Sequence, residues 1–429
     1  MRLALTLTLT AAGLTAALTP SAAAPNTGEP VITWKKTVLD TKFRSEGVAV
    51  ADVNKDGKID VLNGEYWYEA PDWKAHELQP FMDHKDGLRN YSRVFACWTE
   101  DLNGDGYADL IVIDFPGAPC YWMENPKGKA AGEDGKPLHW KKHIIWHSAC
   151  NETPLYTELT EKGKRVLIMG SQPKGKETEG QMAYFTPNPK DPTALWEMHP
   201  ISEPSVAPEM KDGKPVPNTG KEIPGTRKFS HGLGVGDING DGRADVMCVN
   251  GWWEQPAKAD GKTAWTFHPA NLGAPAADMY AYDMDGDGKA DVISSSAHQF
   301  GIWYHKQRAT SKDGHPTFEK VDLFPKLVSE THAAHFKDID GDGRPDLITG
   351  KRWWSHGRAE PGSDGPAAIY WFKNTKGADG IVKFTPMTID EDSGIGTQFE
   401  VADINGDGLL DVISSNKKGV RVIVQERKK

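Results

Sequence analysis

Short apolar runs, separated by turn-forming residues, follow one another along nearly the whole chain. The runs at 47–51 and 110–113 are purely apolar or small, whereas those at 65–71 and 251–256 are rich in aromatic residues. Runs of this length, bounded by glycine, proline, asparagine and aspartate, are typical of strands, and no stretch shows the period of an amphipathic helix. The pattern predicts an all-β fold.

An aspartate-rich loop of the form D-x-[DN]-x-D-G-x-x-D recurs six times between the predicted strands. A small-and-apolar strand precedes each copy, and a second apolar strand follows it. Next come, in most copies, an aromatic strand and a further strand that opens with an aromatic residue. Each repeat therefore predicts four short strands. The six loops occupy residues 52–60, 101–109, 237–245, 283–291, 338–346 and 403–411.

A seventh, degenerate repeat is predicted at about residues 151–203, where two loops are too far apart for one unit. Glu158 aligns there with the first loop position and Gly163 with the loop glycine, but the other ligand positions are lost. Seven four-stranded units predict a seven-bladed β-propeller. The last unit lacks an outer strand, so we expect the N-terminal strand at 33–40 to close the last blade.

The loops carry the chemistry of a hard divalent cation. Side-chain oxygens at positions 1, 3, 5 and 9 and a backbone carbonyl at position 7 suit Ca²⁺, and glycine at position 6 permits the sharp turn. An EF-hand would need a glutamate at position 12 and flanking helices, which the pattern lacks. We expect up to six Ca²⁺ ions that staple the blades, rather than a regulatory or catalytic centre, because six equivalent sites cannot all be an active site. The expected ligands are Asp52, Asn54, Asp56, Lys58, Asp60, Asp101, Asn103, Asp105, Tyr107, Asp109, Asp237, Asn239, Asp241, Arg243, Asp245, Asp283, Asp285, Asp287, Lys289, Asp291, Asp338, Asp340, Asp342, Arg344, Asp346, Asp403, Asn405, Asp407, Leu409 and Asp411.

Glutamate or histidine stands six residues before the first loop position in four of the seven repeats. In a propeller this position starts the innermost strand, so equivalent residues of different blades converge at one rim of the central channel. Glu46, Glu152, His231 and His332 are therefore candidate ligands of a divalent transition metal, or candidate general acids and bases. The alternative is that they only cap the strand starts. Arg44 is a candidate catalytic residue that stabilises an oxyanion at the same rim.

Three further features lie near this rim or recur between blades. The proline-rich insertion at 203–227 enters the fourth repeat just before His231, and we interpret it as a lid, a binding loop or a solvated linker. Tyr91 and His84 are expected to cover the opening. The tryptophan pairs at 252–253 and 353–354 suit sugar stacking, but core packing between blades is the preferred interpretation.

Composition excludes several classes of protein. The chain has 429 residues, 50 basic and 60 acidic side chains, a net charge of −10 and 38% hydrophobic residues. This balance is not that of a membrane-spanning, collagen-like or coiled-coil protein. The acidity argues against nucleic acid as a partner, although the metal loops account for much of it. The four cysteines show no CxxC spacing.

Residues 1–24 predict a cleaved signal peptide. Arg2 precedes an apolar, threonine-containing stretch, and Ala22 to Ala24 form a small-residue cleavage site. We therefore expect a secreted, periplasmic or cell-surface protein in which residues 25–429 form a single propeller.

The loop with its flanking strands resembles the FG-GAP or VCBS-type repeat. This resemblance covers about residues 33–425 and implies a seven-bladed propeller with calcium in the blade loops. A weaker resemblance to the propeller part of aldos-2-ulose dehydratases implies a lyase acting on a keto-sugar, although the cupin domains of that family have no counterpart here. We expect a propeller that binds or acts on carbohydrate at the channel mouth. The alternative is a non-catalytic adhesion propeller that binds a polysaccharide or an extracellular protein, so enzymatic activity is left open.

Overall fold

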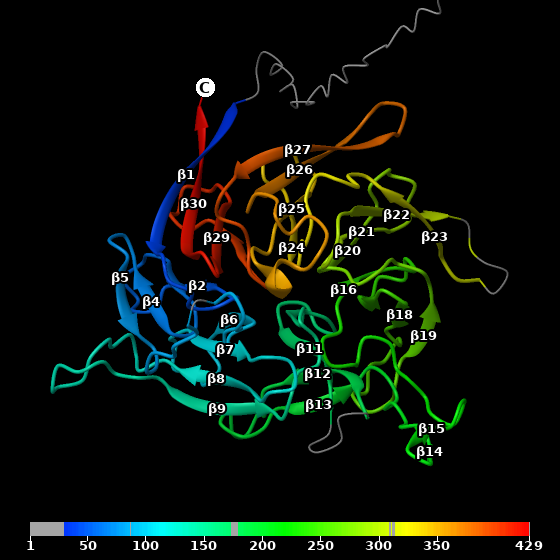
Figure 1. The fold of residues 1–429 in the computed structure, drawn as a ribbon, viewed down its shortest axis with the longest axis horizontal. Helices are drawn as coiled ribbons and strands as arrows, with labels where there is room; N and C mark the ends of the chain where they lie inside the picture. The colour runs from blue at the N-terminus through cyan, green and yellow to red at the C-terminus, as the bar shows by residue number, and fades with distance from the viewer. Residues whose placement is uncertain (1–29, 86, 173–178, 309, 311–313, 429) are drawn as a thin grey trace, which may run out of the picture.

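The computed structural model describes residues 30–85, 87–172, 179–308, 310 and 314–428. Within these residues, all regular structure is β-strand apart from one short 3-10 helix. The sheets surround a central axis as blades of a β-propeller, which confirms the all-β prediction (Figure 1). The expected signal peptide at 1–24 lies outside the described residues. No helix in the described part of the chain is long and apolar enough to cross a membrane.

Four of the separate sheets are antiparallel, contain four strands and follow the chain outward from the axis. The innermost strands contain alanine, except in the degenerate repeat, and the second strands are buried apart from Arg165, as the apolar runs in the sequence predict. The degenerate repeat forms one of these sheets, β10–β13, without the loop ligands. The strands are β2 (Ala49–Ala51), β3 (Asp60–Leu62), β4 (Tyr66–Glu69) and β5 (Lys74–Glu77); β6 (Ala96–Glu100), β7 (Asp109–Ile113), β8 (Cys120–Glu124) and β9 (Lys141–Trp146); β10 (Leu155–Glu158), β11 (Arg165–Ser171), β12 (Gln181–Thr186) and β13 (Glu197–Pro200); β24 (Ala334–Lys337), β25 (Asp346–Gly350), β26 (Ile369–Lys376) and β27 (Val382–Asp390).

The fourth and fifth of the seven repeats share one eight-stranded sheet. Two antiparallel halves are joined by a parallel pairing of their innermost strands, in which Gly234 lies opposite Met279. A Cβ atom at Gly234 would lie 2.3 Å from the Met279 carbonyl oxygen, so glycine is required for this close approach. The described residues thus contain five separate four-stranded sheets, not seven. The order in the large sheet is β19 (Thr266–Pro269), β18 (Gly251–Glu254), β17 (Asp245–Cys248), β16 (Leu233–Gly236), β20 (Met279–Tyr282), β21 (Asp291–Ser295), β22 (Ile302–Arg308) and β23 (Thr317–Asp322).

The N-terminal strand completes the sheet formed by the C-terminal end of the chain. Strand β1 (Val31–Asp40) contains the expected 33–40 segment and pairs antiparallel with β30 (Gly419–Lys428). The other strands are β29 (Asp411–Asn416) and β28 (Glu400–Ala402). Because β1 covers the edge of β30, the two ends of the described chain lie side by side (Figure 1).

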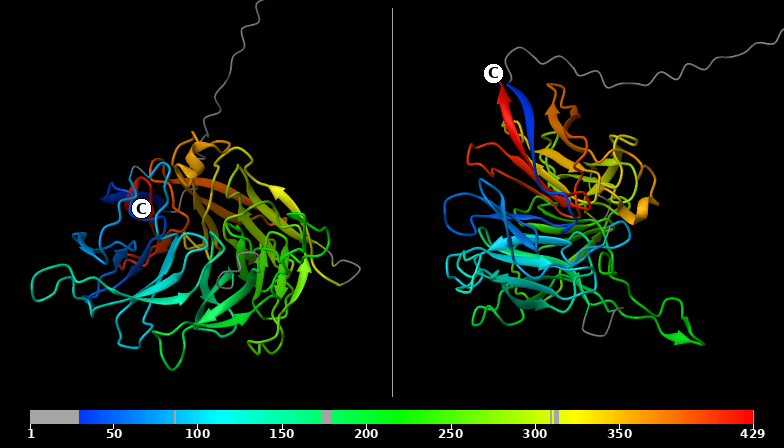
Figure 2. Two further views of the ribbon diagram at one scale, coloured as in Figure 1. Left: turned by 60° about the horizontal axis from the view of Figure 1, so that its bottom comes forward. Right: turned by 60° about the vertical axis from the view of Figure 1, so that its left-hand side comes forward.

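Two insertions lie outside the blades. The hairpin of β14 (Met210–Lys211) and β15 (Lys214–Pro215) belongs to the 203–227 segment and projects away from the ring (Figures 1 and 2). The lid interpretation is therefore wrong for the tip of this segment. The segment that reaches the centre is instead 351–368, which carries the 3-10 helix η1 (Ser355–Arg358) (Figure 1).

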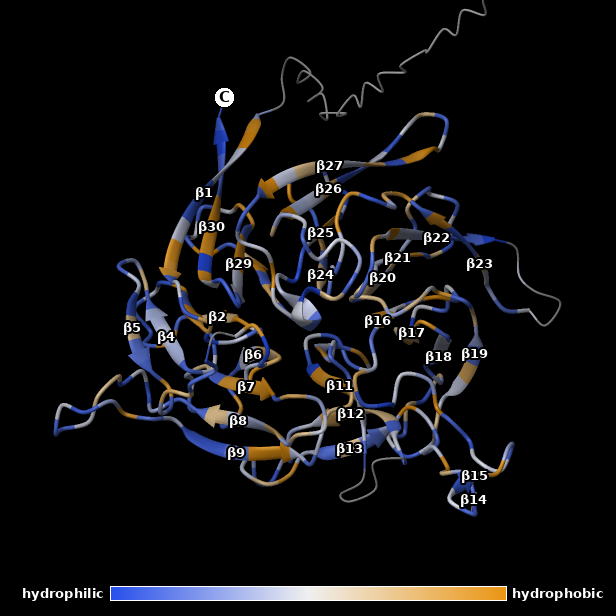
Figure 3. Ribbon diagram, viewed as in Figure 1, coloured by the Kyte–Doolittle hydropathy of each residue, from blue (hydrophilic) through white to orange (hydrophobic). Residues whose placement is uncertain are grey.

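The core lies between neighbouring sheets. Trp67, Trp122 and Trp252 are at most 1% exposed, and Figure 3 shows hydrophobic stretches on strands such as β7 and β11. The core interpretation is right for the pair at 252–253 but wrong for the pair at 353–354, which is half-buried beside η1. The aromatic strand of that repeat is β26, so residues 351–368 are an insertion that separates Trp353 and Trp354 from the blade.

Deletion of the residues up to Asp40 tests the closure of the ring. The free edge of β30 would then be exposed, and an exposed edge promotes association. We expect a lower melting temperature and oligomers in size-exclusion chromatography. A synthetic peptide of residues 30–41 should restore the monomer and the melting temperature. An unchanged, monomeric truncated protein would show that β1 does not close the ring.

Candidate functional site

The six aspartate-rich loops share one hydrogen-bonding pattern. In the first loop, the Asp52 carboxylate accepts the N–H groups of Asp56 (3.1 Å) and Gly57 (2.9 Å), which curls the backbone around the acidic side chains. The glycine at position 6 has a φ between 82° and 87° in every loop, a left-handed conformation that glycine adopts without strain. The turn predicted from the sequence is therefore present in all six loops.

The aspartate at position 9 ties each loop to the blade. Asp60 is fully buried and accepts the N–H groups of Val53 (3.0 Å) and Ala70 (2.8 Å), which lie in the loop and after the third strand. Burial, partly opposed by these two hydrogen bonds, raises the pKa of Asp60 to about 6. A nearby cation would favour the ionised form of this carboxyl group.

Two loops have carboxylate oxygens gathered closely enough to hold one ion. Oxygens of Asp283, Asp285 and Asp287 lie within 4.8 Å of one another, as do those of Asp338, Asp340 and Asp346. Such oxygen-rich groups suit a hard cation. The residues present thus fit the ligand set that the sequence predicts.

At the opposite ends of the inner strands, one arginine joins the predicted acidic residues. Arg352, which is 2% exposed, donates one hydrogen bond to Glu46 Oε1 (3.1 Å) and one to Glu152 Oε2 (3.2 Å). Its Nη1 also lies 3.0 Å from Nε2 of His332. Glu46, Glu152 and His332 come from three different repeats, so ring closure brings together residues that are far apart in sequence.

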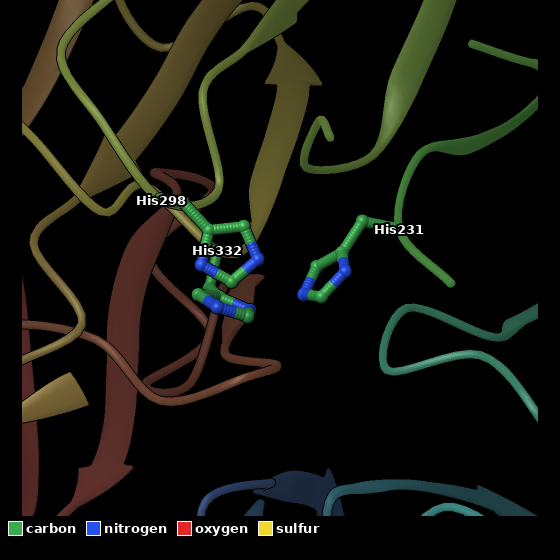
Figure 4. A group of neighbouring side chains, drawn as sticks. All are labelled: His231, His298 and His332. Atoms are coloured by element: carbon green, nitrogen blue, oxygen red, sulfur yellow. The ribbon is translucent and has the colours of Figure 1, made fainter. Parts of the chain in front are cut away.

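Four imidazoles gather beside this arginine. The ring nitrogens of His231, His298 and His332 lie within 4.8 Å of one another. In Figure 4, His298 and His332 lie on one side and His231 faces them from the other. The fourth ring, His356, lies 4.8 Å from that of His298, measured between centroids. Glu360 Oε1 lies 3.4 Å from His298 Nδ1 and 3.3 Å from His356 Nδ1.

Burial and positive neighbours keep these imidazoles neutral. Burial, with smaller contributions from His298 and Arg352, lowers the pKa of His231 to about 3. Burial and Arg352 lower the pKa of His332 well below its ordinary value and that of His356 to about 4. A neutral imidazole has a free lone pair, which is the form that binds metal.

The acidic members of the site behave differently. Burial raises the pKa of the Glu152 carboxyl group, although Arg352 opposes the shift. Burial disfavours the charged form of Arg352, but Glu46 and Glu152 more than compensate, so its pKa is raised and it remains a cation. A buried arginine between two acidic side chains, next to neutral imidazoles, gives the site a fixed cation.

Arg44 contacts other carboxylates than those of the predicted catalytic group. Its Nε donates to Asp40 Oδ2 (2.7 Å), and its Nη1 lies 3.7 Å from Glu65 Oε2. His84 binds the other oxygen of Glu65 at 2.9 Å. The prediction for Arg44 is therefore wrong because nearby carboxylates hold its guanidinium, and Arg352 is the arginine of the Glu/His group. Of the two expected covering residues, Tyr91 lies near this group, with its ring 5.3 Å from Arg352 Cζ.

Sequence reasoning missed Arg352, His298, His356 and Glu360. All four lie between the second and third strands of their repeats, and the alignment compared only the starts of the first strands. Two signals were available in the sequence. The aromatic run at 369–372 marks the true third strand of its repeat, and Ser355-His356-Gly357 repeats the Ser-His-Gly of residues 230–232.

A cavity of about 320 Å³ lies along the axis below this group. Its lining includes Asp278, His335, Gln398 and Glu400. Asp278 accepts the N–H of Ala334 (2.9 Å), and His335 Nε2 lies 2.8 Å from the Phe399 carbonyl oxygen. These residues therefore line the channel and do not join the Glu/His group.

Comparison with known proteins supports the repeat assignment. The FG-GAP-like repeat model matches residues 283–349 and 338–414. The chain contains FG-GAP-like repeats. No curated protein matches the sequence.

Two solved structures match the chain at low identity and with low TM-scores. A lectin from Agrocybe aegerita, described as recognising non-reducing terminal N-acetylglucosamine, is 16% identical over 94% of this chain and 87% of the lectin, with a TM-score of 0.40. The V. cholerae biofilm matrix protein Bap1 is 14% identical over 68% of this chain and 39% of that protein, with a TM-score of 0.31.

The low pKa of His231 predicts an acid-sensitive fold. The unfolded chain takes up this proton near the ordinary value of 6.5, whereas the folded protein does so only near 3. Above pH 6.5, the contribution of His231 to the free energy of unfolding should therefore be constant. Below pH 6.5, this contribution should fall by about 1 kcal/mol per pH unit. In urea unfolding between about pH 6.5 and pH 4, His231→Gln should make the slope shallower. His139→Gln, at an exposed histidine, is the control, and equal slopes in all three proteins would contradict the assignment.

Arg352→Met should destabilise the protein strongly. Glu46 and Glu152 would be left as buried carboxylates without a cation, a loss that typically costs about 3–5 kcal/mol. The measurement is the free energy of unfolding in urea. The triple variant Arg352→Met/Glu46→Gln/Glu152→Gln should be more stable than the single variant, because it removes the uncompensated charges. A single variant as stable as the wild type would show that the ion pairs contribute little.

Proposed function

We propose that this protein is an exported, calcium-stapled, seven-bladed propeller whose channel mouth binds a divalent transition metal and acts on carbohydrate. One observation carries the proposal. Three neutral imidazoles, His231, His298 and His332, offer nitrogens within 4.8 Å of one another beside a buried Glu–Arg–Glu group. Three histidine ligands with a free coordination position are typical of catalytic metal sites.

The count of seven blades treats the eight-stranded sheet as two blades. Each half has four antiparallel strands and its own aspartate-rich loop, at 237–245 and 283–291. Only two residue pairs join the halves. The five four-stranded sheets and these two halves then make the seven repeats that the sequence predicts.

Calcium in the six loops follows from their oxygen ligands and their backbone geometry. The uniform turn at position 6 and the buried aspartate at position 9 hold the other acidic side chains on one side of each loop. Bound Ca²⁺ would offset the mutual repulsion of these carboxylates. The loops therefore stabilise the blades, and the proposed metal binding and reaction take place at the channel mouth.

The surroundings of the three imidazoles suit a divalent cation. Glu152 Oε2 lies 3.7 Å from Nε2 of His231 and 3.9 Å from Nδ1 of His332, and Glu360 lies beside His298. Each of the three ligands thus has an acidic neighbour that can orient its ring. The charges of Glu46 and Arg352 cancel, and the carboxylate of Glu360 balances part of the charge of a divalent ion.

In its sharp form, the proposed reaction is the loss of water from a keto-sugar. The metal would polarise the carbonyl group of the sugar. Glu360, which is partly exposed, takes the proton from the carbon next to the carbonyl, and the electron pair of that bond forms a carbon–carbon double bond. The hydroxyl group on the following carbon leaves with a proton from Glu152, whose pKa is raised. The products are water and an unsaturated ketone.

This assignment changes the roles of His231 and His332. Both are buried and have ring nitrogens within 4.8 Å of each other, which suits metal ligands better than the bases that the sequence suggested. Arg352 replaces Arg44 as the cation at the site, and its hydrogen bonds to Glu46 and Glu152 make it a positioning residue.

Metal analysis tests the proposal. Purified protein, after mild chelation, should retain one equivalent of a transition metal in elemental analysis, and His298→Ala should lose it while retaining calcium. The control is His199→Ala, at a histidine stacked on Tyr184 in an outer strand. Formation of the unsaturated ketone from keto-sugars is then followed by ultraviolet absorbance. Carbohydrate binding without turnover or transition metal would favour the alternative, a non-catalytic binding propeller.

A further inference from the structure

The third strand of each blade places one residue against position 3 of the metal loop. This residue directly precedes the one whose N–H binds the position 9 aspartate, so the six repeats can be aligned without ambiguity. The aligned residues are Glu69, Glu124, Glu254, Lys306, Lys373 and Val424. In five of the six repeats their charge follows the residue type at position 3 of the loop, and the exception is the uncharged Val424 opposite Asn405.

Three repeats combine asparagine at position 3 with glutamate on the third strand. In the first, Asn54 Oδ1 accepts the N–H of Asp56 (3.0 Å) while its Nδ2 donates to Glu69 Oε1 (3.0 Å). The other oxygen of Glu69 is bound by His76 Nε2 (2.8 Å), and the His76 ring stacks on Trp67 at 4.4 Å between centroids. Glu69 thus fixes the orientation of the Asn54 amide through its nitrogen, while the oxygen faces the N–H of Asp56.

The glutamate–histidine pair recurs in the other two asparagine–glutamate repeats, where the Asn239 amide binds Asp241 Oδ2 (3.1 Å) rather than the glutamate. Glu124 pairs with His143 at 2.8 Å and Glu254 with His268 at 2.7 Å. Each histidine lies against the indole of its own blade. The glutamates follow loops whose third residues are Asn103 and Asn239.

Two repeats combine aspartate at position 3 with lysine. Asp285 Oδ1 accepts the N–H of Asp287 (3.2 Å), and its Oδ2 is bound by Lys306 Nζ. Asp340 Oδ2 lies 2.5 Å from Lys373 Nζ. The strand residues that take the place of the histidine are Val321 and Met387, and a lysine needs no second partner of that kind.

The two remaining repeats have no charged third-strand residue at the aligned position. The last loop has Asn405 opposite Val424, and its amide binds Asp407 (3.0 Å), as the Asn239 amide binds Asp241 (3.1 Å). The degenerate repeat has lost the loop ligands, and Thr186 stands where the glutamate would be, bound to His199 at 2.9 Å. The glutamate is thus absent where the cation ligands are absent.

We infer that the third-strand residue is a positioning residue for the metal ligand at position 3, and that its charge selects amide or carboxylate there. In both classes Oδ1 stays on the inner side, bound to the N–H of position 5. Only the outer atom changes, from the amide donor that Asn54 presents to Glu69 to the carboxylate acceptors that Asp285 and Asp340 present to lysine. This inference rests on the proposed binding of Ca²⁺ to the loops.

The physical basis is matched polarity. Aspartate opposite Glu69 would place two carboxylates within hydrogen-bonding distance, and asparagine opposite Lys306 could turn its amide nitrogen inward and withdraw the oxygen ligand. Either mismatch moves the position 3 oxygen away from the cation. A matched exchange of both residues restores it, because the chain already contains both matched forms.

A double-mutant cycle in the first loop tests the inference. Asn54→Asp and Glu69→Lys should each weaken the binding of one Ca²⁺ equivalent by about tenfold, and the double variant should recover most of the loss. Bound calcium is counted by elemental analysis after dialysis against a series of free Ca²⁺ concentrations. The melting temperature at saturating Ca²⁺ checks that each variant folds.

Asn405→Asp is the matched control, because the last loop has no glutamate opposite position 3. It should keep or strengthen Ca²⁺ binding, unlike Asn54→Asp. If the effects of the two single variants in the first loop simply add, the positioning role is wrong while calcium binding stands. If the wild-type protein binds no calcium, both this inference and the proposed calcium sites are wrong.

Discussion

The buried aspartate at position 9 is the interaction on which each blade depends. Asp60, Asp109 and Asp245 are fully buried, and each accepts one N–H from its own loop and one from the residue after the third strand. A buried carboxylate is costly unless it is hydrogen-bonded or paired. The loop and the third strand must therefore stay in register, and this register also places the third-strand side chain opposite position 3.

Closure of the ring turns these repeated blades into one site. The N-terminal strand pairs with the last strand, and the inner strands then start around one axis. Glu46, Glu152 and His332, which are separated by more than a hundred residues, meet at Arg352. The guanidinium bridges two acids that would otherwise repel each other in a buried position. The chemistry of the channel mouth thus depends on a side chain from an insertion rather than on the repeat itself.

The negative charge of the acidic side chains is balanced by different groups at the two ends of the inner strands. At the loops, exposed carboxylates are arranged so that only a small cation, or a lysine, can relieve their repulsion. At the channel mouth, buried acids are neutralised by Arg352, and burial keeps the imidazoles uncharged. The same inner strands therefore connect the acidic loops at one end to the buried Glu/His group at the other.

The sequence by itself determined the repeat, the turn at each loop glycine and the strand order within a blade. These features depend on contacts between residues that are close in the chain, and their pattern recurs six times. It also indicated the four Glu/His positions, because equivalent strand starts must converge in a closed ring. The joining of two repeats into one sheet was not visible, since it depends on the close approach of Gly234 to Met279. Only the tertiary structure decided that Arg352, not Arg44, belongs to the site. Both arginines lie near acidic residues, and which carboxylates each one meets is set by long-range packing rather than by neighbours in the sequence.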